Sequence, residues 1–185
     1  MSELFSIQLQ NRQQQGRDGV WLDLPTTTEQ VQAALRQIGI SSDNPQGLFI
    51  SGYFAEEEKR FAIPYNMVLA SNVDELNFLA SRLETLSTGE RAELNAALQA
   101  PQSELSSIGK ITDFPENVDY YVHLPDVHGP AQLGDYYLNR SGMVDMPEEW
   151  KGGIDTAQFG RYVAQQEQGA FTQYGYLVKS GDEWQ

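Results

Sequence analysis

The chain has 185 residues, 40% of them hydrophobic, with 26 Asp or Glu against 12 Lys or Arg, so its formal net charge at pH 7 is −14. It contains no cysteine, which excludes disulfides, thiolate nucleophiles and cysteine-based zinc sites, and the hydrophobic fraction excludes a disordered acidic tail. Because such a chain is repelled by phosphates, we expect no direct nucleic-acid binding and favour a partner with a basic groove.

The first part of the chain, residues 1–62, is predicted to form a β-β-α-β subdomain. Apolar and polar residues alternate over 5–9 and again over 20–24, which is typical of strands with one buried face. A helix follows the threonines after Pro25 and ends at Gly39. Its apolar residues share one face: Val31, Leu35 and Ile38. The segment from Gly47 to Phe54 is predicted to be a third strand.

The middle part, residues 63–108, is predicted to be helical, with short loops that favour antiparallel packing. Asn72, with Glu75 three residues later, resembles a capping box at a helix start. The helix behind it carries one apolar stripe: Leu76, Leu79, Leu83 and Leu86. A second helix follows the break at Ser87 to Glu90. A third, short helix is predicted from Pro101 and Ser103 to about Gly109.

The last part, residues 109–185, is predicted to be mixed α and β. It contains a strand at 120–124, a short helix at 132–139, and a terminal strand at 171–179. A further helix is predicted to start at Asp155, with Gln158 three residues later, and to end near Gly169. The fold class is therefore α+β with three small subdomains. Net charge deepens along the chain, from −3 over 1–62 to −4 over 63–108 and −7 over 109–185.

The best candidates for chemistry are His123, Asp126 and His128, because two imidazoles and a carboxylate could hold a zinc or iron ion. Their spacing matches no metal motif, and the neighbouring prolines and glycine make a turn the simpler interpretation. Among 26 acids some pair will always suit a glycosidase, so the presence of such a pair is not specific evidence for that activity. The sequence also contains no glycine-rich phosphate loop and no Gly-x-Ser-x-Gly nucleophile elbow. We therefore predict that the protein is not an enzyme and has no catalytic residue, metal or cofactor. A carboxylate- or metal-dependent hydrolase is kept as the least favoured interpretation.

Tyrosines are concentrated in the last third of the chain, as Tyr120-Tyr121, Tyr136-Tyr137 and Tyr174 with Tyr176. A strand or helix has one inward face, so about half of them are expected in the core. The others suit an interface, since each has an apolar ring and a polar tip. This pattern favours a homodimer formed through the C-terminal part.

The sequence gives no signal for secretion or membrane insertion. Residues 1–5 lack a basic segment followed by an apolar run. The most apolar stretch, Gly47 to Ala55, is too short to span a bilayer. A cytoplasmic protein is predicted.

Four segments, in chain order, carry a resemblance to a known family: Trp21 to Thr27, Asn72 to Asn77, Leu124 through Tyr137, and Phe159 to Tyr162 with Gly175-Tyr176. Together they make nearly the whole chain resemble the ArdA antirestriction proteins. The third segment is similar to the family's antirestriction motif. Its residues are expected to contribute to that motif or to the dimer region: Leu124, Asp126, Val127, Leu133, Asp135, Tyr136 and Tyr137.

The resemblance implies an elongated, curved, three-part α+β protein that dimerises through its C-terminal part and travels on mobile genetic elements. It implies an acidic mimic of bent DNA that inhibits type I restriction-modification enzymes by occupying their DNA-binding groove, with the methyltransferase core or specificity subunit as the partner. The acids expected to form this mimic surface are Asp74, Glu75, Glu84, Glu90, Glu93, Asp113, Glu116, Asp119, Asp126, Asp135, Asp145, Glu148, Glu149 and Asp155. The alternative is an acidic adaptor or regulator that binds another basic, DNA-associated protein.

Overall fold

The computed structural model describes residues 3–14, 18–41, 45–57 and 60–185, and its contacts divide the chain into two compact units. Unit 1 is Met1–Ser87 with Leu105–Pro115, and unit 2 is Thr88–Glu104 with Glu116–Gln185. Each unit combines helices with one antiparallel sheet, which confirms the α+β fold class. The division into three subdomains stays a prediction.

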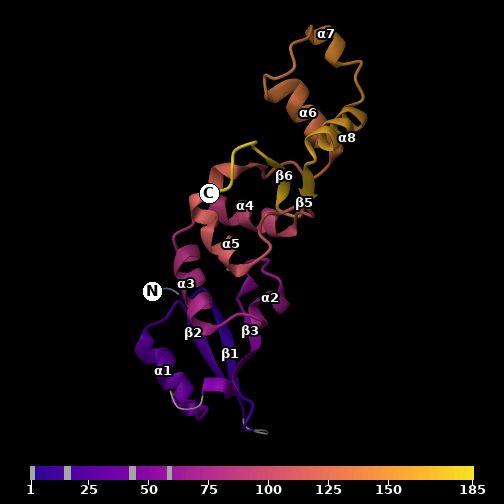
Figure 1. Ribbon diagram of the computed structural model, residues 1–185. Coiled ribbons are helices and arrows are strands. Elements are labelled where there is room, and N and C mark those ends of the chain that lie inside the picture. The colour runs from indigo at the N-terminus through magenta and orange to yellow at the C-terminus, as the bar shows by residue number, and fades with distance from the viewer. Residues whose placement is uncertain (1–2, 15–17, 42–44, 58–59) are drawn as a thin grey trace. The chain divides into compact units, whose positions relative to one another are not determined.

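Unit 1 is built on a three-stranded sheet in the order β2-β1-β3, with α1 beside it in Figure 1. Its elements are β1 (Phe5–Asn11), β2 (Val20–Leu24), α1 (Thr28–Gln37), a 3₁₀ turn (Pro45–Gly47), β3 (Leu48–Phe54), α2 (Tyr65–Leu69), α3 (Val73–Glu84) and α5 (Ile108–Asp113). The alternation seen in the sequence buries one sheet face, since Ile7 and Leu9 are fully buried. The strands expected in this part are therefore confirmed.

Side-chain caps fix the helix starts in unit 1. Thr27 and Gln30 form a reciprocal capping box at α1. The Asn72 side chain accepts a 2.8 Å hydrogen bond from the Glu75 backbone N–H, which confirms the predicted start of α3. The leucine stripe of α3 is buried, and α5 packs against this helix. The side chain of Asn77 in α3 also holds both backbone groups of Thr26, at 2.7 and 3.0 Å.

Unit 2 contains the second sheet, in the order β4-β6-β5. Its elements are α4 (Thr88–Gln99), a 3₁₀ turn (Val118–Tyr120), β4 (Tyr121–Leu124), α6 (Pro130–Asp135), a π-helix (Tyr136–Arg140), α7 (Glu148–Lys151), α8 (Thr156–Glu167), β5 (Ala170–Thr172) and β6 (Gly175–Lys179), and a 3₁₀ turn at Phe114–Glu116 leads into it. Helices α6 and α8 pack closely together, and α4 packs against β4 and β6. The side chain of Asp155 caps α8 through a 2.9 Å hydrogen bond from the Gln158 N–H, as the sequence predicted.

Three elements differ from the prediction. The short helix expected to end near Gly109 instead begins after Ser107, whose side chain accepts the Lys110 N–H, because only this serine acts as the cap. The helix expected at 132–139 starts earlier and continues as a π-helix. The single strand expected at 171–179 is a hairpin, since the chain turns before Gly175, whose φ of +117° favours glycine.

No helix within the described residues is long and apolar enough to cross a membrane.

Candidate functional site

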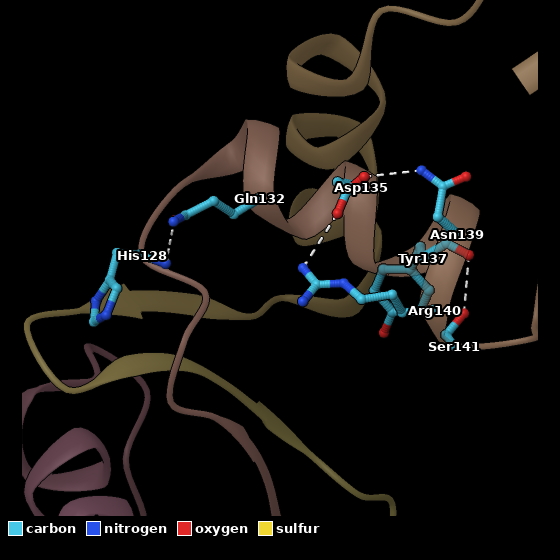
Figure 2. A network of polar contacts seen from close by, with 7 residues as sticks. All are labelled: His128, Gln132, Asp135, Tyr137, Asn139, Arg140 and Ser141. Carbon is cyan, nitrogen blue, oxygen red and sulfur yellow. Dashed lines mark hydrogen bonds and ion pairs between the residues drawn. The ribbon is translucent and has the colours of Figure 1, made fainter. Parts of the chain in front are cut away.

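The segment that resembles the antirestriction motif runs from the end of β4 through a turn into α6 and the π-helix. The Val127 N–H donates to the Leu124 carbonyl at 3.2 Å and closes the turn. The His128 N–H donates to Oε1 of Gln132 at 2.7 Å, which fixes the entry into α6 (Figure 2). Pro130 occupies the first turn of α6, where its fixed φ suits a helix start.

Two of the motif's apolar residues lie in the core of unit 2. Val127 and Leu133 are buried against Tyr176 of β6, with exposed fractions of 2% and 0%. Leu124, Tyr136 and Tyr137 pack around this cluster and are partly buried. The buried residues therefore hold the fold, and only the partly exposed ones can contact a partner.

A polar network covers the outer side of the same segment (Figure 2). The Asp135 carboxylate accepts a hydrogen bond from Asn139 at 2.8 Å and forms a 3.2 Å ion pair with Arg140. The Arg140 guanidinium also lies 5.8 Å from the ring centre of Tyr136. Asp135 is thus partly compensated by a cation, which weakens it as a phosphate-like charge.

A second polar array lies on the inner side of the motif. The two carboxylate oxygens of Glu167 in α8 accept hydrogen bonds from Tyr137 at 2.5 Å and from Tyr176 at 3.0 Å. Burial, together with the Glu167 carboxylate, raises the pKa of both tyrosines above their usual range. The two phenols therefore remain proton donors at neutral pH and fasten the π-helix and β6 to α8.

Helices α6 and α8 touch through glycines. A Cβ atom built on Gly134 would overlap the backbone of Thr156, and one built on Gly160 would overlap the carbonyl group of Pro130. Each position therefore excludes any side chain larger than hydrogen. This close contact aligns the motif helix with α8.

The acids expected to form the mimic surface differ in exposure. Nine are exposed: Asp74, Asp113, Glu116, Asp119, Asp126, Asp145, Glu148, Glu149 and Asp155. Five are only partly exposed: Glu75, Glu84, Glu90, Glu93 and Asp135.

The charge is unevenly divided between the units, since unit 1 holds 12 acidic and 7 basic residues, and unit 2 holds 14 acidic and 5 basic residues. The net charge is therefore −5 in unit 1 and −9 in unit 2.

Glu93 is the acid whose environment departs most from that of a surface charge. Its Oε1 atom is buried in α4 and has no hydrogen-bond partner within the described part of the chain. Burial, and then the neighbouring carboxylates of Glu90 and Asp119, raise the pKa of Glu93 to about 7. Glu93 is therefore only partly ionised at neutral pH and contributes less than a full charge.

The residues considered for a metal are not arranged as ligands. The Nε2 atom of His123 lies 2.7 Å from the carbonyl oxygen of Tyr174, so this nitrogen carries the proton that it donates. Asp126 and His128 are exposed on the turn after β4. Within residues 3–14, 18–41, 45–57 and 60–185, no three His, Cys, Asp or Glu side chains are grouped to hold a metal ion.

The structure adds surface features that the sequence did not indicate. A groove of about 320 Å³ in unit 2 is lined by apolar groups of Val122, Leu124, Val178, Tyr136 and Met143. Val122 is 44% exposed on β4, an edge strand of the sheet. Tyr121, the preceding residue of the strand, is buried, and no periodicity in a four-residue strand could have indicated which of its side chains lie at the surface.

The chain matches the model of a known protein family. The family model described as antirestriction protein (ArdA) matches residues 15–178, which is most of the chain. A search of curated proteins found no match. The matched range contains the motif segment, both polar arrays and the two touching glycines. The chain therefore belongs to the ArdA family of antirestriction proteins.

Proposed function

We propose that this protein inhibits type I restriction-modification enzymes by occupying the DNA-binding surface of their methyltransferase core. The observation that carries the proposal is the net charge of −9 on unit 2, where most of the acids expected to form the mimic surface are exposed. A basic groove that binds phosphates attracts such a surface, and this attraction raises the rate of association between the two proteins.

The mimicry is partial. B-form DNA carries one charge per about 1.7 Å of its axis, so a net charge of −14 corresponds to about 24 Å of duplex for each copy of the protein. Glu93 reduces the effective charge further, because its raised pKa leaves it partly protonated at neutral pH. The ion pair with Arg140, whose charge is already counted, offsets Asp135 locally. Binding is therefore distributed over many carboxylates, and no single acid dominates it.

A homodimer through unit 2 is part of the proposal. The groove is lined by Val122, Leu124 and Val178, and Glu167 is the only acid among the described residues that line it and is bonded to Tyr137. Two copies can bury this surface against each other in a self-complementary contact. Sedimentation of the wild type as a dimer, and of Val122→Asp as a monomer, is the expected result, and a monomeric wild type at micromolar concentration would contradict it.

The test of the main proposal is competition. A type I methyltransferase core is bound to a labelled duplex that carries its recognition site, and the protein is added at increasing concentration. We expect complete displacement of the duplex, weaker at high salt because counterions screen both surfaces. Single neutralisations such as Glu116→Gln should change the inhibition constant little, whereas the triple change Glu116→Gln, Asp119→Asn and Asp126→Asn should raise it by about tenfold or more.

A control set keeps the fold and removes the same charge elsewhere. The matched variant neutralises three exposed acids of unit 1: Glu3→Gln, Asp23→Asn and Glu29→Gln. Equal loss of inhibition in the two sets would show a non-specific charge effect. Absence of any displacement by the wild type, together with recovery of another basic protein from a pull-down, would support the acidic adaptor instead.

A further inference from the structure

One segment of unit 2, residues 141–154, contributes no buried residue to the core. These residues connect the π-helix to α8, and their only helix is the short α7. Helix α7 lies away from β5 and β6 (Figure 1). Local turns hold it, since the Trp150 N–H donates to the Pro147 carbonyl at 3.0 Å and the Gly153 N–H donates to the Trp150 carbonyl at 3.0 Å. The segment is therefore a formed projection.

The projection carries a large aromatic side chain in water. Trp150 is 69% exposed. Trp184, the other tryptophan of unit 2, packs within the unit instead, since its ring lies edge-on to that of Tyr120 at a centroid distance of 5.1 Å. No aromatic ring in the described part of the chain packs on Trp150. Tryptophan has a large apolar area and is among the residue types most enriched at the centres of binding interfaces. The exposure of Trp150 therefore suits a contact with another molecule.

The charges around Trp150 define the chemistry of that molecule. Asp145, Glu148, Glu149 and Asp155 lie within a few residues of it and are exposed. Lys151 is the single base between residues 145 and 155, and its Nζ forms a 2.6 Å ion pair with Glu148. A self-complementary contact with a second copy would place these acids against their own equivalents, which is unfavourable. A partner with basic side chains around an apolar or planar pocket is complementary.

We infer that Trp150 acts as a base-like group, entering a position on the partner's DNA-binding surface that otherwise takes a nucleobase. This inference rests on the proposed function. Surfaces that bind DNA supply cations for phosphates and planar or apolar side chains for bases, and an indole offers the same flat π-face as a base. The flanking carboxylates then take the places of phosphates on either side. Trp150 supplies affinity that does not depend on salt, and the acids supply the part that does.

The experiment repeats the competition between the protein and a labelled duplex for a type I methyltransferase core, at several salt concentrations. We expect Trp150→Ala to raise the inhibition constant by about tenfold, since stacking of one aromatic group contributes on that scale, and to leave the slope of its salt dependence unchanged. Trp150→Phe should restore most of the affinity. Glu149→Gln should instead lower the salt slope, because it removes a charge.

The matched control is Tyr162→Ala. Tyr162 is 60% exposed on α8 of the same unit, next to Arg161 and away from the acids of the projection in sequence. We expect its removal to leave inhibition unchanged. Circular dichroism confirms that each variant is folded, and tryptophan emission should shift to the blue when the wild type, but not Trp150→Phe, binds the enzyme.

Three results would overturn the inference, each in a different way. Equal inhibition by Trp150→Ala and the wild type would remove the role of Trp150 and leave the proposed function intact. Conversion of a wild-type dimer to a monomer by Trp150→Ala would assign the projection to contact between copies. Failure of the wild type to displace DNA at all would overturn the proposed function and this inference with it.

Discussion

The two units differ in what holds them together. Unit 1 buries 23 of the apolar residues that the structure describes, and unit 2 buries 9, although the units are of similar length. Unit 2 also carries the larger net charge, −9 against −5. Apolar burial stabilises a fold by about 1.5–3 kcal/mol for each large side chain, and like charges repel, so both differences lower the stability of unit 2. A strongly charged unit must therefore rely on contacts that need little apolar surface, and unit 2 has two of them: the glycine contact and the Glu167 array.

The largest expected effect comes from breaking the contact between α6 and α8. Gly134→Ala places a methyl group against the Thr156 carbonyl, where backbone has to move. We expect it to lower the free energy of unfolding of unit 2 by about 3 kcal/mol or more, because overpacking against a backbone cannot relax by rotation of a side chain. Hydrogen exchange of the α6 and α8 amides measures this locally. The control is Gly152→Ala, where a Cβ atom meets nothing within 4 Å. Protection factors equal to those of the wild type in Gly134→Ala would show that the helices are less closely packed than described.

The next effect concerns the Glu167 array. Glu167→Gln replaces a charged acceptor shared by Tyr137 and Tyr176. We expect a loss of about 2 kcal/mol in the free energy of unfolding, since hydrogen bonds to charged groups contribute more than neutral ones. Urea unfolding followed by tyrosine absorbance gives the value. Glu183→Gln makes the same change at an exposed position and should cost little, so similar losses in the two variants would contradict the special role of the array.

A smaller effect depends on pH. Because the fold raises the pKa of Glu93 to about 7, from 4.5 in the unfolded chain, folding favours the protonated carboxyl. The stability that this group contributes is complete below about pH 4.5 and is lost as the pH rises through about 7. Glu93→Gln should therefore remove this slope and raise the free energy of unfolding at pH 8 by about 1 kcal/mol, a value reduced by the partial exposure of the residue. Urea midpoints of both proteins from pH 4.5 to pH 8 test it, and parallel curves would refute it.

The smallest expected effect separates stability from function at the motif surface. Arg140 and Asp135 are both about half exposed, so Arg140→Gln should change the free energy of unfolding by about 0.5 kcal/mol or less. The same variant frees the Asp135 charge and should strengthen inhibition slightly. Thermal unfolding and the competition assay, run on one preparation, measure both. A large loss of stability would show that the Asp135 network, like the Glu167 array, stabilises the fold of unit 2.

Much of the secondary structure follows from local patterns, whereas the site does not. The alternation around Ile7, the stripe of Leu76 to Leu86 and the cap at Asp155 each need only neighbouring residues, and all are present in the structure. The start of α5 was misplaced because Ser103, Ser106 and Ser107 are all suitable caps, and tertiary packing selects among them.

The contacts that hold the motif join residues far apart in the chain. Tyr137 meets Glu167 across 30 positions, and Gly134 meets the backbone at Thr156. No periodicity encodes such pairs. The acids of the expected surface could be read from composition, but the burial of the Glu93 oxygen depends on how α4 packs, so its altered pKa could not. The exposure of Trp150 likewise depends on how residues 141–154 pack in the folded chain.

The path of the chain between the units has a consequence for its synthesis. The chain leaves unit 1 after Ser87, contributes Thr88–Glu104 to unit 2, returns for Leu105–Pro115, and leaves again. Helix α5, which packs on α3, is therefore made after α4, whose strand partners β4 and β6 come still later. On the ribosome, unit 1 cannot be completed until residue 115 has emerged, and α4 lacks its sheet until β6 (Gly175–Lys179) has been made. A chain that ends at residue 115 therefore contains all of unit 1 together with α4, whereas unit 2 without unit 1 requires that Thr88–Glu104 be joined to Glu116–Gln185.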